Sequence, residues 1–246
     1  MSALLRSEAR KALATSTVSW LLPLTAVVGV VGTLAPLVAS SPGTDPLSDD
    51  GLQQAMHGAA AGATLVIVAG IVGTAGEWRF GQSTQTFLTT PRRSHVLLAK
   101  GLVHLAIGSI YGIAAGVAAT AAAWGWYRSN GHTLPLERSA VWLTLLGCLA
   151  VSALFGVLGV AIGAIARSQT TAIVGVLGWH VLIEPTLFTA SPTVFRWSPG
   201  MASFALRRQP SDDFLTAGPA ALVLVAFIAA LCAAGLRSVE RADVTA

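Results

Sequence analysis

Two ionisable residues inside an apolar stretch of this sequence share one face of a predicted helix. His180 and Glu184 are four positions apart, a spacing that places two side chains on the same side of a helix. Charge is costly to bury in lipid, so an ionisable pair at membrane depth is a candidate functional site. The pair suits either a proton relay or a structural, cavity-lining role. His104, in another apolar stretch, is typical of a hydrogen-bonded core histidine.

The sequence lacks the common motifs for nucleotide binding and catalysis. It contains no GxxxxGK[ST] phosphate loop, no HExxH metal motif and no GxSxG nucleophile elbow. The five histidines do not have the spacing of a metal site. We therefore expect a chain that is not an enzyme and holds no cofactor or metal of its own.

One polar, basic segment, Glu77–Lys100, lies between two apolar stretches and offers a second kind of site. A Ser or Thr near its middle would cap a short helix, which Pro91 would stop. Phe87 and Leu88 would then supply apolar contacts to a groove on another protein. The alternative is a solvated loop that carries positive charge for topological reasons alone.

The elements around these sites are predicted to be membrane-spanning helices. Hydrophobic residues make up 54% of the chain and charged residues 11%, with a mean hydropathy of +0.69, whereas soluble domains carry about 25% charged residues. A span needs about 20 apolar residues. The sequence supplies six such stretches, which predict an all-α, polytopic membrane protein with a single domain, 1–246. Their approximate bounds are Val18–Ala39, Met56–Ala75, Val96–Trp124, Val141–Ile165, Thr171–Leu187 and Leu215–Leu236.

The distribution of Lys and Arg predicts that both termini are cytoplasmic. With the N-terminus inside, ten cations face the cytoplasm and five face outward, in agreement with the positive-inside rule. The net charge of +4 is thus explained by topology, and we expect no nucleic-acid partner. Tryptophan favours membrane interfaces, and only Trp179 falls deep within a predicted span.

Two segments outside the spans have a character of their own. Residues 1–16 are predicted to form an amphipathic helix with Leu4, Leu5 and Ala12 on its apolar face, which suits a helix in the membrane interface or a basic anchor. Its cations, including Lys11, are expected near lipid headgroups. Residues 188–214 combine prolines with apolar side chains, which predicts short re-entrant or interfacial helices before the last span.

Glycines recur every four residues in three of the predicted spans. Such faces allow close helix approach in lipid. Packing within one bundle and packing between two copies of the chain would both use them. The glycines are Gly58, Gly62, Gly108, Gly112, Gly116, Gly159 and Gly163.

The chain as a whole resembles the permease subunits of ABC-2 type ATP-binding cassette transporters. The most specific local likeness is Glu77, Arg79 and Gly81, followed by the run Thr90-Pro91-Arg92-Arg93 and by Ala99-Lys100. The turn Gly163–Thr170 after the fourth span and Glu184-Pro185 in the fifth also resemble this family.

The resemblance implies a coupling loop, residues 77–95, that docks on a separate ATPase subunit. The implied docking residues are Glu77, Arg79, Gly81, Phe87, Leu88, Pro91, Arg92 and Arg93. ATP and Mg²⁺ would be bound by that partner, and a second permease copy or a related permease would complete the path. The implied function is export of an amphipathic or hydrophobic compound, such as a drug, antibiotic, peptide or lipid, across a bacterial plasma membrane. The alternative is a secondary carrier driven by an ion gradient through His180 and Glu184.

Overall fold

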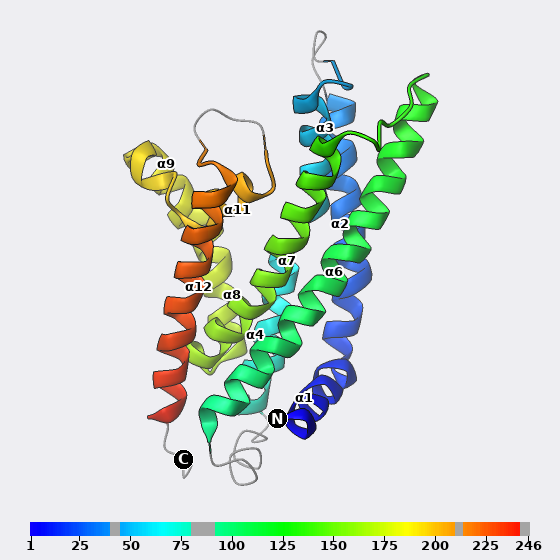
Figure 1. Ribbon diagram of the computed structural model, residues 1–246. Coiled ribbons are helices and arrows are strands. Elements are labelled where there is room, and N and C mark those ends of the chain that lie inside the picture. The colour runs from blue at the N-terminus through cyan, green and yellow to red at the C-terminus, as the bar shows by residue number, and fades with distance from the viewer. Residues whose placement is uncertain (40–44, 80–91, 210–213, 242–246) are drawn as a thin grey trace.

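The computed structural model describes residues 1–39, 45–79, 92–209 and 214–241, and every regular element in these ranges is a helix. The longer helices lie side by side as one bundle (Figure 1). The elements are α1 (Ser2–Ala14), α2 (Ser16–Ala39), α3 (Asp49–Met56), the 3₁₀ turn η1 (His57–Ala60), α4 (Ala63–Arg79), α6 (Arg93–Ser129), α7 (Ser139–Ala166), α8 (Gln169–Gly178), the π-helical turn η2 (Trp179–Ile183), α9 (Glu184–Ala190), α10 (Pro192–Phe195), α11 (Pro199–Leu206) and α12 (Ala217–Glu240).

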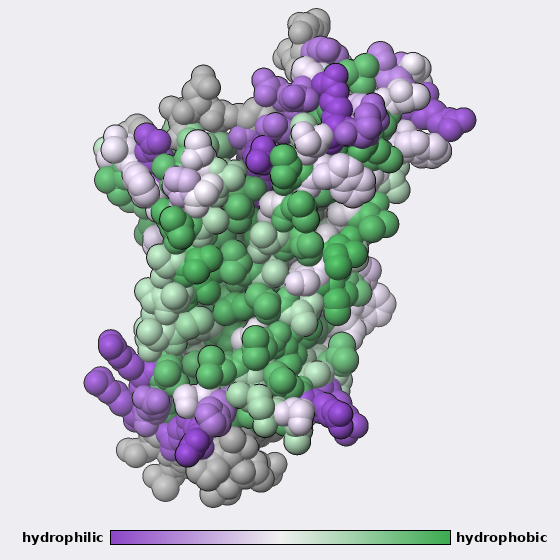
Figure 2. All heavy atoms as spheres, viewed as in Figure 1, coloured by the Kyte–Doolittle hydropathy of each residue, from purple (hydrophilic) through white to green (hydrophobic). Residues whose placement is uncertain are grey.

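Six helical stretches are long and apolar enough to cross a membrane, as predicted. On the face that Figure 2 shows, apolar residues cover the middle of the molecule as a belt, and polar residues gather at both ends. Large apolar side chains such as Trp20, Leu222 and Val181 are mostly exposed on this belt. Because water would oppose such exposure, the belt is the surface that lipid covers.

The bounds of two predicted segments differ from the observed ones. The second span begins earlier than predicted, because α3, η1 and α4 together form one candidate span, Asp49–Trp78. Of the predicted coupling loop 77–95, residues 77–79 belong to α4 and residues 93–95 to α6, while residues 80–91 lie outside the described residues. The observed helices include polar residues at these ends, because a helix extends past the lipid boundary into the interface. Hydropathy alone therefore does not fix where such a helix begins or ends.

The start of α1 and the end of α12 lie at the same end of the bundle (Figure 1), which we call the terminal end. The last turn of α4 and the first turn of α6 lie there too. The opposite end carries α3, α9 and α11. The predicted irregular region 188–214 contains the end of α9 and the short helices α10 and α11, as expected.

The glycine repeats pack helices within this one chain. A Cβ at Gly159 of α7 would lie 2.2 Å from the carbonyl oxygen of Ile67 on α4, and one at Gly108 of α6 would lie 2.4 Å from that of Ser152 on α7. Gly58 similarly abuts Gly32 on α2. Only a residue without a side chain permits such contact. Of the two readings of these glycines, the structure supports packing within the bundle.

Candidate functional site

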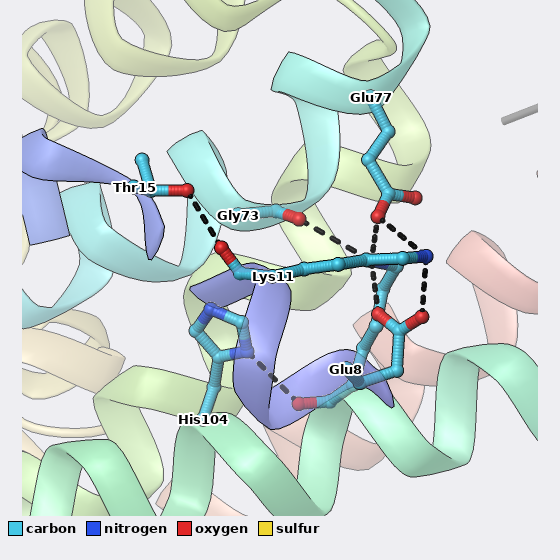
Figure 3. Close-up of polar contacts among 7 residues, drawn as sticks. Glu8, Lys11, Thr15, Gly73, Glu77 and His104 are labelled. Atoms are coloured by element: carbon cyan, nitrogen blue, oxygen red, sulfur yellow. Dashed lines mark hydrogen bonds and ion pairs between the residues drawn. The ribbon is translucent and has the colours of Figure 1, made fainter. Parts of the chain in front are cut away.

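A cluster of four charged side chains joins α1 to α4 and α6 at the terminal end. Lys100 Nζ lies 2.5 Å from Glu8 Oε2 and 2.7 Å from Glu77 Oε1. Lys11 Nζ lies 2.7 Å from Glu8 Oε1 and 3.2 Å from Glu77 Oε1. Two carboxylates and two ammonium groups therefore balance in charge (Figure 3). We call Glu8, Lys11, Glu77 and Lys100 the ion cluster.

The local sequence explains why these side chains meet. Thr15 is extended between α1 and α2, so α1 folds back against the bundle and buries Glu8 and Ala12, one helical turn apart. The hydroxyl of Thr15 donates to the carbonyl oxygen of Lys11 at 3.0 Å. Lys11 was expected near lipid headgroups, but its amine turns inward because two carboxylates are within reach.

The ion cluster is largely shielded from solvent, except at Lys11. The side chains of Glu8, Lys100 and Glu77 are 2%, 6% and 10% exposed, against 34% for Lys11. Burial of a single charge would be costly, whereas mutual pairing offsets much of that cost. Lys100 also donates to the carbonyl oxygen of Gly73 at 3.3 Å.

The pKa values of α1 side chains follow from this pairing. Burial raises the pKa of Glu8, but the charges of Lys100 and Lys11 and their hydrogen bonds outweigh it and hold the pKa below its ordinary value. Burial lowers the pKa of Lys11, yet hydrogen bonds and charges from Glu8 and Glu77 more than compensate, so the pKa is raised. Both residues are thus held in their charged forms.

A polar cavity of about 460 Å³ lies beside the ion cluster, between α1, α4, α6 and the start of α8. His104 lines it, is 2% exposed, and has its Nδ1 3.0 Å from the carbonyl oxygen of Lys100 (Figure 3). Its ring lies against Gly73, where a Cβ would come within 2.4 Å of Nε2. His104 is therefore a hydrogen-bonded core histidine, as expected.

Of the eight implied docking residues, the structure describes the two flanks. Glu77 belongs to the ion cluster, Arg79 is the last residue of α4, and Arg92 is exposed just before α6. Arg93 Nη1 donates to the carbonyl oxygen of Val239 on α12 at 2.8 Å. Gly81, Phe87, Leu88 and Pro91 lie outside the described residues.

A second set of contacts ties α4, α7 and α12 together at the terminal end. Arg167, in the left-handed conformation that ends α7, donates through Nη2 to the carbonyl oxygen and hydroxyl of Ser238. Its guanidinium carbon lies 5.2 Å from the ring centroid of Trp78 on α4. Both flanks of the connection between α4 and α6 are thus anchored to neighbouring helices.

His180 and Glu184 do form a pair, at the other end of the bundle. Glu184 Oε2 lies 3.0 Å from His180 Nδ1, and Glu184 Oε1 accepts from Trp179 Nε1 at 3.0 Å. The π-helical turn η2 brings all three side chains to one side. Trp179 is therefore a hydrogen-bond donor to Glu184. This role accounts for a tryptophan that lies deep within its span and not at a membrane interface.

Sequence reasoning missed two charged residues that the structure buries. Glu8 is the only acidic residue before Asp45, and its position one turn before the buried Ala12 was the available signal. Arg207 is 6% exposed at the end of α11; in sequence it looked like one of two adjacent loop arginines. In the described part of the chain, no three His, Cys, Asp or Glu side chains lie close enough together to hold a metal ion.

No family model matches the sequence of this chain, and no curated protein matches it.

Proposed function

We propose that this multi-pass membrane protein is the permease subunit of an ATP-driven exporter of the ABC-2 type, with its ATPase on a separate chain. The observation that carries the proposal is the ion cluster, which fastens the interfacial helix α1 to the end of α4 and the start of α6. A partner that pushes on the connection between α4 and α6 would move these helices together.

The contacts around that connection support force transmission from a docked protein. The ion cluster links α4 and α6, the two helices that flank the connection, to α1. Arg93, at the start of α6, also links α6 to α12. Arg167 adds a link from α7 to α12. A solvated loop without a docking role would need no such links on both sides. The sequence has no nucleotide-binding loop of its own, which agrees with a separate ATPase that binds ATP and Mg²⁺.

A second copy, or a related permease, is part of the proposal. In the fifth span, Gln169–Ala190, only 11% of an apolar stretch of 18 residues is buried inside the chain, against 72% in the second span. Val181 and Leu182 are among its exposed side chains. This span is the face on which we place the second permease.

The experiment that tests docking replaces Phe87 and Leu88 with Asp. Two carboxylates at an apolar contact would be desolvated on docking, so ATPase co-purification and ATP-driven transport should be lost. Leu136→Asp, on an exposed apolar residue in another connection, is the matched control and should keep both. Undiminished ATP-driven transport by the Phe87→Asp/Leu88→Asp double variant would contradict the docking role.

A secondary carrier driven by an ion gradient is the second candidate. The contact between His180 and Glu184 favours it, because both side chains line a hollow at the end opposite the termini. Such a carrier would lose transport when the gradient collapses and would be insensitive to ATP depletion.

A further inference from the structure

Arg207 is a buried cation with no acidic partner among the described residues. Its Nε donates to the carbonyl oxygen of Ser203 at 3.3 Å, and its guanidinium carbon lies 4.2 Å from the ring centroid of Phe204. None of the ion pairs in the described ranges includes it. Burial lowers the pKa of Arg207, but arginine does not deprotonate in proteins under ordinary conditions. A charge in this position is costly unless an anion joins it.

The side chain of Arg207 faces a hollow of about 590 Å³ between α4, α7, α9 and α11. His57 and His180 also line this hollow, as do aromatic residues such as Phe204. Glu184 is the acidic residue on its wall, and both of its oxygens already accept hydrogen bonds, from Trp179 and from His180. The guanidinium group thus pairs with no carboxylate among the described residues, and it favours a ligand with a negative head.

A second, apolar cavity of about 390 Å³ adjoins the hollow. The two share Phe155, His180 and Gly200 in their walls. The apolar cavity extends between α7, α8 and α12, where Phe227 and Leu231 line it. Its volume is within the range of small-molecule sites, and its lining suits a hydrocarbon chain.

We propose that the hollow and the apolar cavity form one binding site for a single-chain anionic amphiphile. Its phosphate or carboxylate head binds Arg207 by charge-assisted hydrogen bonds, and its chain fills the apolar cavity. As a cargo class this deepens the proposed export function and rests on it. Binding itself rests only on the two cavities, so it is measured without ATP or an ATPase.

The test measures equilibrium binding of radiolabelled dodecyl phosphate to the purified full chain in phosphatidylcholine nanodiscs, after subtracting partition into empty discs. We expect saturable binding to the wild type and a Kd raised at least about tenfold by Arg207→Gln, the size of a lost hydrogen bond to a charged group. Arg207→Lys should fall between the two, because it keeps the charge without the fork geometry. Arg208→Gln, which removes the same charge one residue away, is the matched control and should change the Kd less than about twofold.

Ligand variation tests the site without any substitution, should Arg207→Gln fail to fold. Dodecanol lacks the charge and butyl phosphate lacks the chain, so each should bind at least about tenfold more weakly than dodecyl phosphate. Equal binding of dodecanol, equal binding of inorganic phosphate, or an unchanged Kd in folded Arg207→Gln would overturn the proposal. None of these results depends on whether the chain exports anything.

Phosphatidylglycerol in the nanodiscs distinguishes two sources of the same anionic chemistry. If it does not displace dodecyl phosphate, the site takes a free single-chain amphiphile, as proposed. If it does, the head of a two-chain bilayer lipid enters the site, and the single-chain assignment is overturned while the anionic head at Arg207 is retained.

Discussion

Lys100 on α6 lies 2.5 Å from Glu8 on α1, although 92 positions separate them in the sequence. The contact makes α1 part of the bundle and not merely a helix resting on lipid. Glu77 binds the same amine from α4, so one buried cation holds three helices together. Two of these helices, α4 and α6, flank the connection that we propose as the ATPase docking site.

Replacing Glu8 with Gln should destabilise the protein by about 3 kcal/mol, since loss of one partner leaves Lys100 and Lys11 with a single carboxylate between them. Thermal unfolding in detergent measures this change. Arg10→Gln, on the exposed side of α1, is the control and should alter stability by less than about 0.5 kcal/mol.

A double variant separates pairing from packing. Glu8→Leu with Lys100→Met removes opposite charges together, so it should cost less than the sum of the single replacements. Strict additivity of the two single effects would show that the ion pair contributes nothing.

Acid should weaken the attachment of α1 in a way that depends on Glu8. The pKa of Glu8 is lower in the folded protein than its ordinary value of 4.5. Its ion pairs therefore contribute stability above pH 4.5 and lose it as pH falls through the lower folded value. We expect the unfolding temperature to drop below pH 4.5 in the wild type, with a shallower dependence in Glu8→Gln. Identical pH profiles would assign the loss to another group.

Lys11 sets the corresponding limit at high pH. Its pKa is raised above the ordinary 10.5, so its contribution is complete below pH 10.5 and disappears as pH rises through the folded value. Between these limits Glu8 and Lys11 both keep their charges.

The spans were predictable because lipid leaves few choices for an apolar stretch of about 20 residues. Helix ends were less so, as the extension of α4 to Arg79 illustrates. The ion cluster was beyond sequence reasoning for a different cause. Its members come from three distant segments, and the i, i+3 spacing of Glu8 and Lys11 does not indicate that Glu77 and Lys100 join them.

The pair of His180 and Glu184 was predictable because one helix carries both residues, and i, i+4 spacing holds through most helical distortions. The involvement of Trp179 was not, because it depends on the π-helical turn, which widens the helix at residues 179–183. Arg207 was missed for want of any local signal that α11 turns its end inward.

Close packing of α4 on α7 should make Gly159 intolerant of a side chain. A Cβ there would lie 2.2 Å from the carbonyl oxygen of Ile67, so Gly159→Ala must push the helices apart and should cost about 1–3 kcal/mol. Gly101→Ala, where nothing lies within 4 Å, is the matched control. It should leave stability unchanged or raise it by about 0.5–1 kcal/mol, because Ala favours the helix. Equal unfolding temperatures for the two variants would contradict the packing argument.

Glu184→Gln discriminates between the two candidate functions. Glutamine matches glutamate in size, so the close approach to Gly200 and the acceptor for Trp179 are kept while the charge beside His180 is lost. If the chain is an ATP-driven permease, transport by Glu184→Gln should persist within about threefold and remain insensitive to a protonophore, because no proton passes through the pair. If it is a gradient-driven carrier, the same change should abolish transport, because the proton-accepting carboxylate is gone. Transport in proteoliposomes, with ATP or a pH gradient supplied separately, measures the difference.

Glu137→Gln, in the connection before α7, is the control, since it removes the same charge at an exposed position outside the spans. Loss of gradient-driven transport in a folded Glu184→Gln protein, with Glu137→Gln unaffected, would favour the carrier and count against the exporter.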